Sequence, residues 1–381
     1  MFFYLQILAA SIQDGHTRIR FPVAQLARNK PAFPLRLKVL NGAYYVIENL
    51  GSNDIPENCT LVAINDIPMH TLFEKCMPLL STSSVHGRRF LFEQYFHSLI
   101  TIYLKMEPPW RVRYKFDSQE GESDLSAISQ WEFVKRMKKA SDRYRSYLVF
   151  TEGAEVPVLE LPNFSYGDAD TYKQFVDRFF YKYQDSPYLI IDVRHNRGGS
   201  GYWGFYLLDY LHETEYRIAD RFTFRVSEKM RNSRYALKAG DRLKYAQTGD
   251  YVDAIDHRIR TPHKSPNKFK GKTFLLISAK TFSAGAVFAA VFKANNMGLV
   301  LGQETSGRIQ LCSDPISLTL PNSGLEVTIP LAIYTLPGDN PDRGVRPDVK
   351  VIKTLETYQL NQDPEIEKVK ELIWSDLKKS L

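Results

Sequence analysis

Cysteine is scarce in this sequence: only Cys59, Cys76 and Cys312 occur among its 381 residues. None of the three belongs to a C-x-x-C pair, and none has a histidine at the spacing of a zinc ligand. The spacing therefore excludes the usual zinc-binding modules and disulfide frameworks, and it permits at most one disulfide.

The sequence also lacks an apolar run of about 18 residues, the length that a membrane-spanning helix needs. Its 50 basic and 43 acidic residues give a formal net charge of +7 and are spread along the chain, without a block of five like charges. The 22 Tyr and 23 Phe residues fall on apolar faces and do not alternate with a basic stripe. These absences exclude a membrane span and argue against a nucleic-acid partner.

The N-terminal residues, MFFYLQILAAS, are apolar and end in small side chains. No basic region precedes them, and they lead directly into the turn at Asp14. Two interpretations fit: a helix packed on the protein, which we favour, and the remnant of a signal peptide. The stretch does not make a convincing signal peptide as it stands.

The rest of the chain has ordinary globular composition, with 44% hydrophobic and 24% charged residues, and is long enough for two or three domains. Residues 1–30 are predicted to form a helix and a turn, and residues 31–80 a small β module. Residues 81–145 are typical of a connecting region of helix and strand, with the polar segment 117–124 as a linker. From residue 146 to 381, strands alternate with helices, which predicts an α/β domain with a largely parallel sheet.

A buried strand over residues 188–193 leads into a turn that contains Gly198 and Gly199. Consecutive glycines let backbone N–H groups point into a cavity without side chains in the way, which is what an oxyanion hole requires. The alternative is a flexible turn that only ends the strand. Both interpretations fit the stretch taken alone.

Ser283 lies between a predicted strand, residues 272–278, and an alanine-rich helix that continues to Ala294. A serine at this place can act as an ordinary helix cap. The position also suits a nucleophile, because the amide of Ala284 and the positive end of the helix dipole stabilise charge on an attacked carbonyl oxygen. Lys280, three residues earlier, is a candidate base but an unpersuasive one.

His16 stands in the turn sequence Asp14-Gly-His-Thr. A histidine in a turn is usually a solvated surface residue, but it serves as a general base when a carboxylate orients it. Glu304 and Asp342 are the carboxylate candidates, and either can equally be a turn former.

Four motifs occur in order along the chain. They are Asp192-x-Arg-x-Asn-x-Gly-Gly199, Ser283-Ala-Gly285, Gly302-x-Glu-Thr-x-Gly307 and Arg343-Gly-Val-x-Pro-Asp-Val349. The ordered set resembles the tail-specific (C-terminal processing) and tricorn-type family of serine peptidases over residues 146–353. Asp14-Gly-His-Thr resembles a motif of the histidine-containing branch.

The resemblance implies a role for each of the matching positions. Ser283 would be the nucleophile. The oxyanion hole would consist of the amide of Ala284 and the amide of Gly198 or Gly199.

One large branch of the family uses a lysine base directly after the last glycine of the Gly-x-x-Thr-x-Gly motif. That residue is Arg308 here, and an arginine stays protonated, so it cannot accept the serine proton. The tricorn-like branch uses a histidine instead, which fits His16. Its acidic partner would be Asp342, or alternatively Glu304.

The resemblance also implies a fold and a setting. We expect a crotonase-like catalytic domain over residues 146–381 and a PDZ-like module over residues 31–80, in which Ile64-Asn-Asp-Ile-Pro68 resembles the family's Ile-Asn-Gly-x-Pro turn. The expected activity is that of a serine endopeptidase, which cleaves peptides or unfolded proteins through an acyl-enzyme without metal or cofactor. Most relatives act outside the cytoplasm, so a periplasmic or secreted location is expected.

Two rival functions stay open on the same sequence. A catalytically silent ligand-binding protein would share the fold without joining Ser283 to His16. A crotonase-type acyl-CoA enzyme would use the glycine turn as its oxyanion hole and would not need Ser283. The presence of both His16 and Ser283 favours the peptidase.

Overall fold

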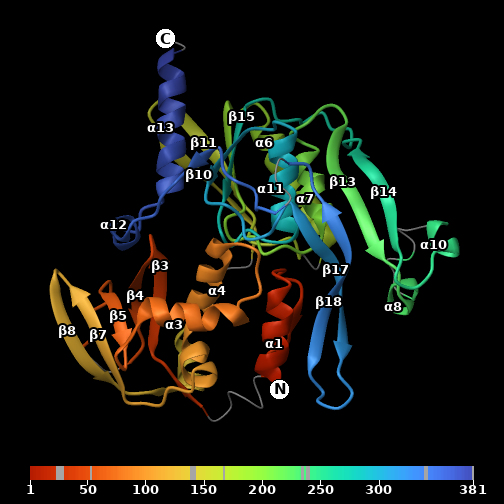
Figure 1. Cartoon of the computed structure of the whole chain (residues 1–381). Coiled ribbons are helices and arrows are strands. Elements are labelled where there is room, and N and C mark those ends of the chain that lie inside the picture. Colours follow the sequence, from red (N-terminus) through yellow and green to blue (C-terminus); the bar gives the residue numbers. More distant parts are fainter. Residues whose placement is uncertain are drawn as a thin grey trace. The chain divides into compact units, whose positions relative to one another are not determined.

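The computed structural model describes residues 1–381 except 23–29, 52–53, 138–142, 166–167, 233–235, 237–240, 339–341 and 380–381, and describes only the backbone of residues 254–257. The chain forms two compact units (Figure 1). Unit 1 consists of Met1–Ala140, Ser317–Thr328 and Lys353–Gln362. Unit 2 consists of Ser141–Ile316, Ile329–Ile352 and Asp363–Leu381. The domain boundaries expected near residues 30, 80 and 145 stay a prediction.

Unit 1 contains an antiparallel sheet of order β3-β4-β5-β7-β8, with β6 paired to β5. Trp110 and Val112 of β7 are buried while Arg111 and Arg113 face outward, because one face of the sheet covers the core. The strands are β3 (Leu35–Leu40), β4 (Ala43–Asn49), β5 (Thr60–Ile64), β6 (Ile67–Pro68), β7 (Trp110–Phe116) and β8 (Gln119–Leu125). A second, two-stranded sheet pairs β2 (Pro31–Ala32) with β9 (Ile128–Ser129).

The linker expected at residues 117–124 is wrong. Residues 119–125 form β8, which pairs with β7 from Phe116↔Gln119 to Trp110↔Leu125. Asp117 and Ser118 connect the strands with φ values of 47° and 67°, as a two-residue hairpin turn requires. The strand is polar because most of its residues are exposed.

Helices pack on the sheet of unit 1 around a core of aromatic residues. The Phe33 ring lies 5.3 Å from the Phe96 ring and 5.0 Å from the Trp110 ring. The helices on this core are α3 (Met69–Cys76), η1 (Met77–Leu79), α4 (Val85–Ser98) and the π-helical turn η2 (Leu99–Tyr103). Helix α5 (Gln130–Arg136) packs through Phe133 against Ala32 and Leu50, and α12 (Leu355–Gln359) has no buried residue.

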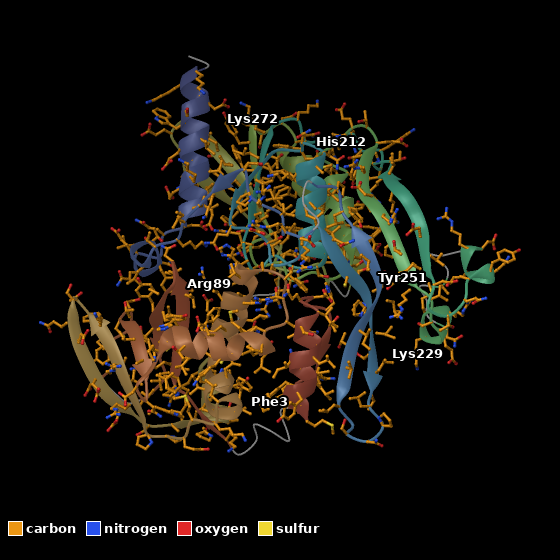
Figure 2. The ribbon with its side chains drawn as sticks, in the orientation of Figure 1. Phe3, Arg89, His212, Lys229, Tyr251 and Lys272 are labelled. Atoms are coloured by element: carbon orange, nitrogen blue, oxygen red, sulfur yellow. The ribbon has the colours of Figure 1, made fainter. Side chains whose placement is uncertain are left out.

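The N-terminal residues fold as predicted, with a helix, a turn and a short extended segment. Helix α1 (Phe2–Ser11) packs through Phe3, labelled in Figure 2, whose ring lies 5.2 Å from that of Tyr103. Strand β1 (Arg18–Ile19) follows and pairs with Val327 and Thr328. Among the described helices, none is both long and apolar enough to cross a membrane.

Unit 2 contains a six-stranded sheet of order β10-β11-β12-β15-β16-β19. Strands β10 and β11 form an antiparallel hairpin, and the other neighbours are parallel. This confirms the predicted mixed α/β fold. The strands are β10 (Arg145–Thr151), β11 (Ala154–Glu160), β12 (Tyr188–Asp192), β15 (Lys272–Ile277), β16 (Leu299–Gly302) and β19 (Val349–Lys350).

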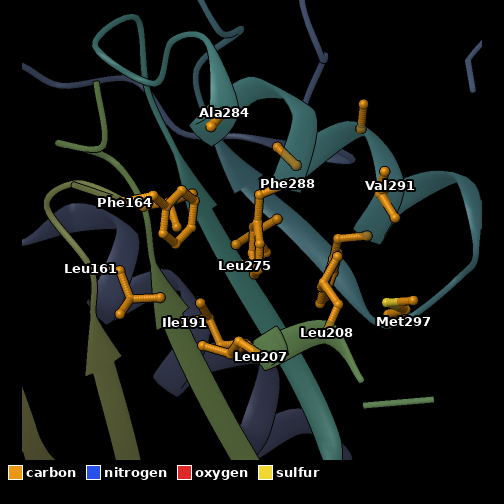
Figure 3. Packing of buried hydrophobic residues seen from close by; sticks show 14 of the residues in the cluster. Leu161, Phe164, Ile191, Leu207, Leu208, Leu275, Ala284, Phe288, Val291 and Met297 are labelled. Carbon is orange, nitrogen blue, oxygen red and sulfur yellow. The ribbon is translucent and has the colours of Figure 1, made fainter. Parts of the chain in front are cut away.

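The central strands of this sheet are buried on both faces. Ile191 and Leu275 pack with Phe288 beneath helices α6 (Ala169–Tyr183), α7 (Gly201–Leu208) and α11 (Ala284–Ala294) (Figure 3). Ile190 and Leu276, which alternate with them, pack on the other face against α13 (Pro364–Lys379). Burial on both faces explains why these strands are continuous apolar runs.

A second group of strands in unit 2 is antiparallel. Strand β13 (Tyr216–Arg225) pairs with β14 (Tyr251–Arg260) and with residues 332–335 of β18 (Glu326–Thr335). Strand β17 (Gln310–Thr319) pairs with β18. Two short helices, α8 (Glu228–Arg231) and α10 (Arg242–Tyr245), lie between β13 and β14 in the sequence.

Arg194 is a buried cation just after β12. Its guanidinium forms ion pairs with Asp192 and Asp363, both at 2.6 Å, and with Glu365 at 3.0 Å. Burial lowers the pKa of a guanidinium, but the charge and hydrogen bonds of Asp192 and Asp363 outweigh this effect, so the pKa of Arg194 is raised. The cluster thus ties the end of β12 to the start of α13.

We expect Arg194→Met to lower the free energy of unfolding by about 3–5 kcal/mol, because it leaves Asp192 and Glu365 in the interior without their cation. Urea denaturation followed by circular dichroism measures the change. Arg145→Met is the control, since it removes an ion pair whose arginine is 65% exposed, and we expect a change of less than about 1 kcal/mol. Equal effects of the two substitutions would contradict a stabilising role of the buried cluster.

Candidate active site

Ser283 occupies the N-cap position of α11 in a backbone conformation that serine rarely adopts, with φ 53° and ψ −125°. Its side chain makes no capping hydrogen bond to the helix. The ordinary helix-cap interpretation of Ser283 is therefore wrong. Conformations of this kind cost roughly 1–3 kcal/mol and collect at functional sites, and a sharp strand-to-helix turn is a known way to hold out a nucleophile.

Hydrogen bonds of the backbone hold the serine turn, which we define as residues 281–285. The Phe282 N–H donates to the Asn196 carbonyl oxygen at 2.9 Å, and the Gly285 N–H donates to the Phe282 carbonyl oxygen at 3.0 Å. The Ser283 carbonyl oxygen accepts the first helical hydrogen bond, from the Val287 N–H at 2.9 Å. One hydrogen bond to a distant residue, Asn196, and two local hydrogen bonds therefore hold the serine conformation.

The glycine turn, residues 196–200, lies directly against the serine turn. Gly198 has φ 103°, and a Cβ atom at this position would lie 2.6 Å from the Ser283 Cβ and 3.1 Å from the Ala284 nitrogen. Gly199 has φ 128°, and a Cβ atom there would lie 2.2 Å from the Phe164 carbonyl oxygen. Both positions thus need glycine, and the structure brings Gly198, Ser283 and Ala284 together.

The amides of these two turns differ in their partners. The Gly198 N–H donates to Asn196 Oδ1 at 2.9 Å. Within the described part of the chain, the Gly199 and Ala284 N–H groups donate no hydrogen bond to another residue. Gly199 and Ala284 are therefore the amides with capacity to bind a ligand oxygen.

Glu304 and Asp342, the two carboxylates expected to support the base, both lie in loops of unit 2. Glu304 is 9% exposed and accepts hydrogen bonds from Arg343 Nε at 3.1 Å and from the Gly344 N–H at 3.0 Å. Asp342 is 79% exposed, and its Oδ1 lies 3.8 Å from Arg308 Nη1. Each carboxylate thus has an arginine neighbour within its own unit.

The loop that carries Arg308 also lies close to the serine turn. A Cβ atom on Gly307 would lie 3.6 Å from the Ser283 nitrogen and 3.1 Å from the Ala286 Cβ. The Ile309 N–H donates to the Arg343 carbonyl oxygen at 2.7 Å, which fixes the loop to the following segment. Arg308, whose guanidinium stays protonated, therefore directly follows Gly307, the glycine that packs on the serine turn.

His16 belongs to unit 1, and its side chain is only 9% exposed. Its Nδ1 lies 3.1 Å from Asp14 Oδ1, while Asp14 Oδ2 accepts hydrogen bonds from the N–H and the hydroxyl of Thr17, both at 3.0 Å. Burial opposes ionisation of Asp14, but the hydrogen bonds and charge of His16 and the hydrogen bond of Thr17 prevail and lower the pKa of Asp14. The expectation of a solvated histidine is wrong.

Asp14 is the residue that the sequence reasoning missed. The resemblance implies Asp342 or Glu304 as the carboxylate partner, and the sequence around Asp14 is most simply explained as a turn. The signal was local: an aspartate two residues before a histidine, followed by Gly and Thr, places the carboxylate within reach of Nδ1 and of the Thr17 donors. A further serine, Ser81, donates to the carbonyl oxygens of Asp14 at 2.7 Å and Thr17 at 2.9 Å and fixes the turn.

The described residues offer neither a metal site nor, at Cys59 and Cys76, a reactive thiol. Among them, no group of three or more His, Cys, Asp or Glu side chains is arranged to hold a metal ion. Cys59, Cys76 and Cys312 form no disulfide with one another. Burial raises the pKa of Cys59 and of Cys76 to about 12, so neither is a thiolate at neutral pH.

Comparison with protein families gives one match: the model of peptidase family S41 matches residues 155–351. This range holds the glycine turn, the serine turn and the loops of Glu304 and Asp342. None of the curated proteins compared with the chain matches it.

Solved structures are similar over almost the whole chain. The structure of mature CPAF complexed with lactacystin is 14% identical, with a TM-score of 0.66 over 97% of this chain and 87% of that chain. The crystal structure of mature CPAF has a TM-score of 0.68 at 14% identity, over 97% and 86% of the two chains. The photosystem II D1 C-terminal processing protease is 15% identical with a TM-score of 0.44, over 92% and 81%. The likeness to CPAF shows a shared fold.

We expect Gly198→Ala to lower the rate at which a fluorophosphonate labels the protein by on the order of 10²-fold, because the new methyl group collides with Ser283 and separates the serine turn from the glycine turn. Labelling is measured by gel fluorescence over time. Gly249→Ala is a matched control: Gly249 has φ 102°, close to the φ of Gly198, but a Cβ atom there meets nothing within 4 Å. The Gly249→Ala variant carries similar backbone strain without a collision. Similar losses of labelling rate in both variants would contradict the argument that the collision with Ser283 causes the effect.

Proposed function

The chain belongs to peptidase family S41 and is a serine peptidase, and on this premise we propose that Ser283 is its nucleophile and His16 the base that activates it. The observation that carries the proposal is the conformation of Ser283. A φ of 53° strains the serine backbone, and the turn that it forms abuts Gly198.

His16 is proposed as the base because its ring is already oriented. The carboxylate of Asp14 accepts from Nδ1, which leaves Nε2 as the proton acceptor of the neutral ring. The position at which one branch of the family carries a lysine holds Arg308, and an arginine does not accept a proton at neutral pH. A Ser/Lys dyad at that position is therefore disfavoured.

We propose Asp14 as the carboxylate that holds His16, in preference to the two residues implied by resemblance. Asp14 lies 3.1 Å from the ring nitrogen and is 13% exposed. Asp342 is largely exposed beside Arg308, and Glu304 binds Arg343 and the Gly344 amide, so both have other roles within unit 2.

The proposed reaction follows from these assignments. His16 Nε2 takes the proton of Ser283 while Oγ attacks the peptide carbonyl carbon. The oxygen becomes negative and accepts hydrogen bonds from the Gly199 and Ala284 N–H groups, aided by the dipole of α11. His16 returns the proton to the leaving amine, and water then hydrolyses the acyl-enzyme by the same route.

The family makes the substrate a peptide or a protein, and we propose an endopeptidase that acts on unfolded chains. We further propose that the β-sheet of unit 2 and its helices are crotonase-like and that residues 31–80 are PDZ-like. The turn at Asn65 and Asp66 has φ values of 47° and 62°, which supports the second likeness although Asp66 replaces the usual glycine. By resemblance to the family, we propose a periplasmic or secreted location.

We expect Ser283→Ala and His16→Ala each to abolish fluorophosphonate labelling and to lower casein cleavage by several orders of magnitude. Lys280→Ala should change either rate by less than about threefold, because Lys280 has no part in the proposed proton transfer. Circular dichroism spectra check that all three variants fold. If Lys280→Ala lost activity and His16→Ala kept it, the base would be Lys280 and not His16.

We expect Asp14→Asn to lower kcat by about 10²–10⁴-fold with little change in KM, since the amide no longer holds the ring in its reactive tautomer. Asp342→Asn should cost less than about tenfold. The measurement is steady-state cleavage of fluorescein-labelled casein at pH 7.5. The opposite order of effects would assign the acidic role to Asp342.

A further inference from the structure

Asn196 is the first residue of the glycine turn and is fully buried, with an exposed fraction of 0%. Its side chain donates from Nδ2 to the Leu161 carbonyl oxygen at 3.0 Å and accepts at Oδ1 from the Gly198 N–H at 2.9 Å. Its backbone carbonyl oxygen accepts from the Phe282 N–H at 2.9 Å. Asn196 thus connects Leu161 at the end of β11, Gly198 in the glycine turn and Phe282 in the serine turn.

Asn196 is tightly packed against the first turn of α11. A Cβ atom on Gly285 would lie 2.7 Å from the Asn196 carbonyl oxygen and 2.9 Å from its Oδ1, so the first turn of α11 rests on the asparagine. Phe164, which follows Leu161, accepts from the Ser200 N–H at 2.8 Å and donates to the Gly198 carbonyl oxygen at 2.7 Å. The glycine turn is therefore held from both sides.

We propose that Asn196 is the positioning residue that aligns the oxyanion-binding amides with the nucleophile. The inference rests on the proposed function of Ser283. By accepting from the Gly198 N–H, the side chain holds the peptide plane of residues 197–198. The Phe164 N–H, which donates to the Gly198 carbonyl oxygen at 2.7 Å, holds the next plane, which carries the Gly199 N–H. Through its own carbonyl oxygen, Asn196 also holds Phe282, the residue before Ser283.

The chemistry of the asparagine side chain matches this task. The position needs a donor toward Leu161 and an acceptor toward Gly198 on adjacent atoms, which a primary amide supplies without charge. A carboxylate would place a negative oxygen against the Leu161 carbonyl oxygen. A protonated carboxyl group would restore both hydrogen bonds, with its hydroxyl as donor and its carbonyl oxygen as acceptor.

The test compares wild type with Asn196→Ala, Asn196→Asp and Asn295→Ala in the full chain. Asn295 is a matched control: it braces the other end of α11 with hydrogen bonds to the backbone of Arg217 at 3.0 and 2.8 Å and to Val291 at 2.8 Å. The readouts are the second-order rate of fluorophosphonate labelling, kcat and KM for fluorescein-labelled casein, and the melting temperature.

We expect Asn196→Ala to lower the labelling rate and kcat by about 10²–10³-fold with KM changed less than about threefold, because misaligned amides fail to stabilise the transition state. Asn295→Ala should lower the melting temperature but leave both rates within about threefold. If Asn196→Ala keeps its rates, or if the two variants lose activity in proportion to stability, Asn196 has a structural role only.

Asn196→Asp gives a second, independent readout and keeps the test valid if the alanine variant does not fold. Burial and the nearby Leu161 oxygen raise the pKa of such a carboxyl group, so the protonated form increases as the pH falls. The activity of Asn196→Asp relative to wild type should therefore rise from pH 8 to about pH 5.5, while that of Asn196→Ala stays constant. A flat ratio for Asn196→Asp would overturn the proposal.

Failure of the proposed function gives a different pattern. If Ser283→Ala still reacts with the fluorophosphonate, Ser283 is not the nucleophile, and the inference about Asn196 falls with it. If Ser283→Ala is unreactive and Asn196→Ala is fully active, only the inference about Asn196 is wrong.

Discussion

The strained backbone of Ser283 is the constraint that the core and the turns of unit 2 must satisfy. A serine with φ 53° and ψ −125° returns to a relaxed conformation unless its surroundings prevent it. The restraint comes from apolar burial on one side, since Ala284, Phe288 and Phe292 of α11 lie in the core. It comes on the other side from the hydrogen bond between Phe282 and Asn196. A large, rigid sheet thus supports one small distortion.

Much of the fold follows from the sequence because its signals are local and periodic. The alternation of strands and helices from residue 146 onward predicts an α/β domain with a largely parallel sheet, and the structure has such a sheet in unit 2. The polar strand β8 was missed because its hairpin turn uses Asp117 and Ser118, without the glycine that usually marks such turns. Exposure on the surface removes the apolar alternation from which strands are recognised.

The site was only partly predictable for a related reason. Ser283, Gly198 and Gly199 can be recognised in the sequence because strained turns need particular residue types, and these types form motifs. The partnership of Asp14 with His16 is hidden by its closeness in sequence, where an aspartate is most simply explained as a turn former. The bridging role of Asn196 depends on Leu161 and Phe282, at sequence separations that no pattern reveals.

The ion pairs of Arg194 have a consequence for the order in which the protein can be completed. Asp192 lies two residues away, but Asp363 and Glu365 follow 169 and 171 residues later. During synthesis the arginine meets its near partner long before the distant carboxylates leave the ribosome. The strand that leads into the glycine turn therefore reaches its final environment only after α13 has been made. A nascent chain that ends before Asp363 lacks two of the three carboxylates that surround this arginine.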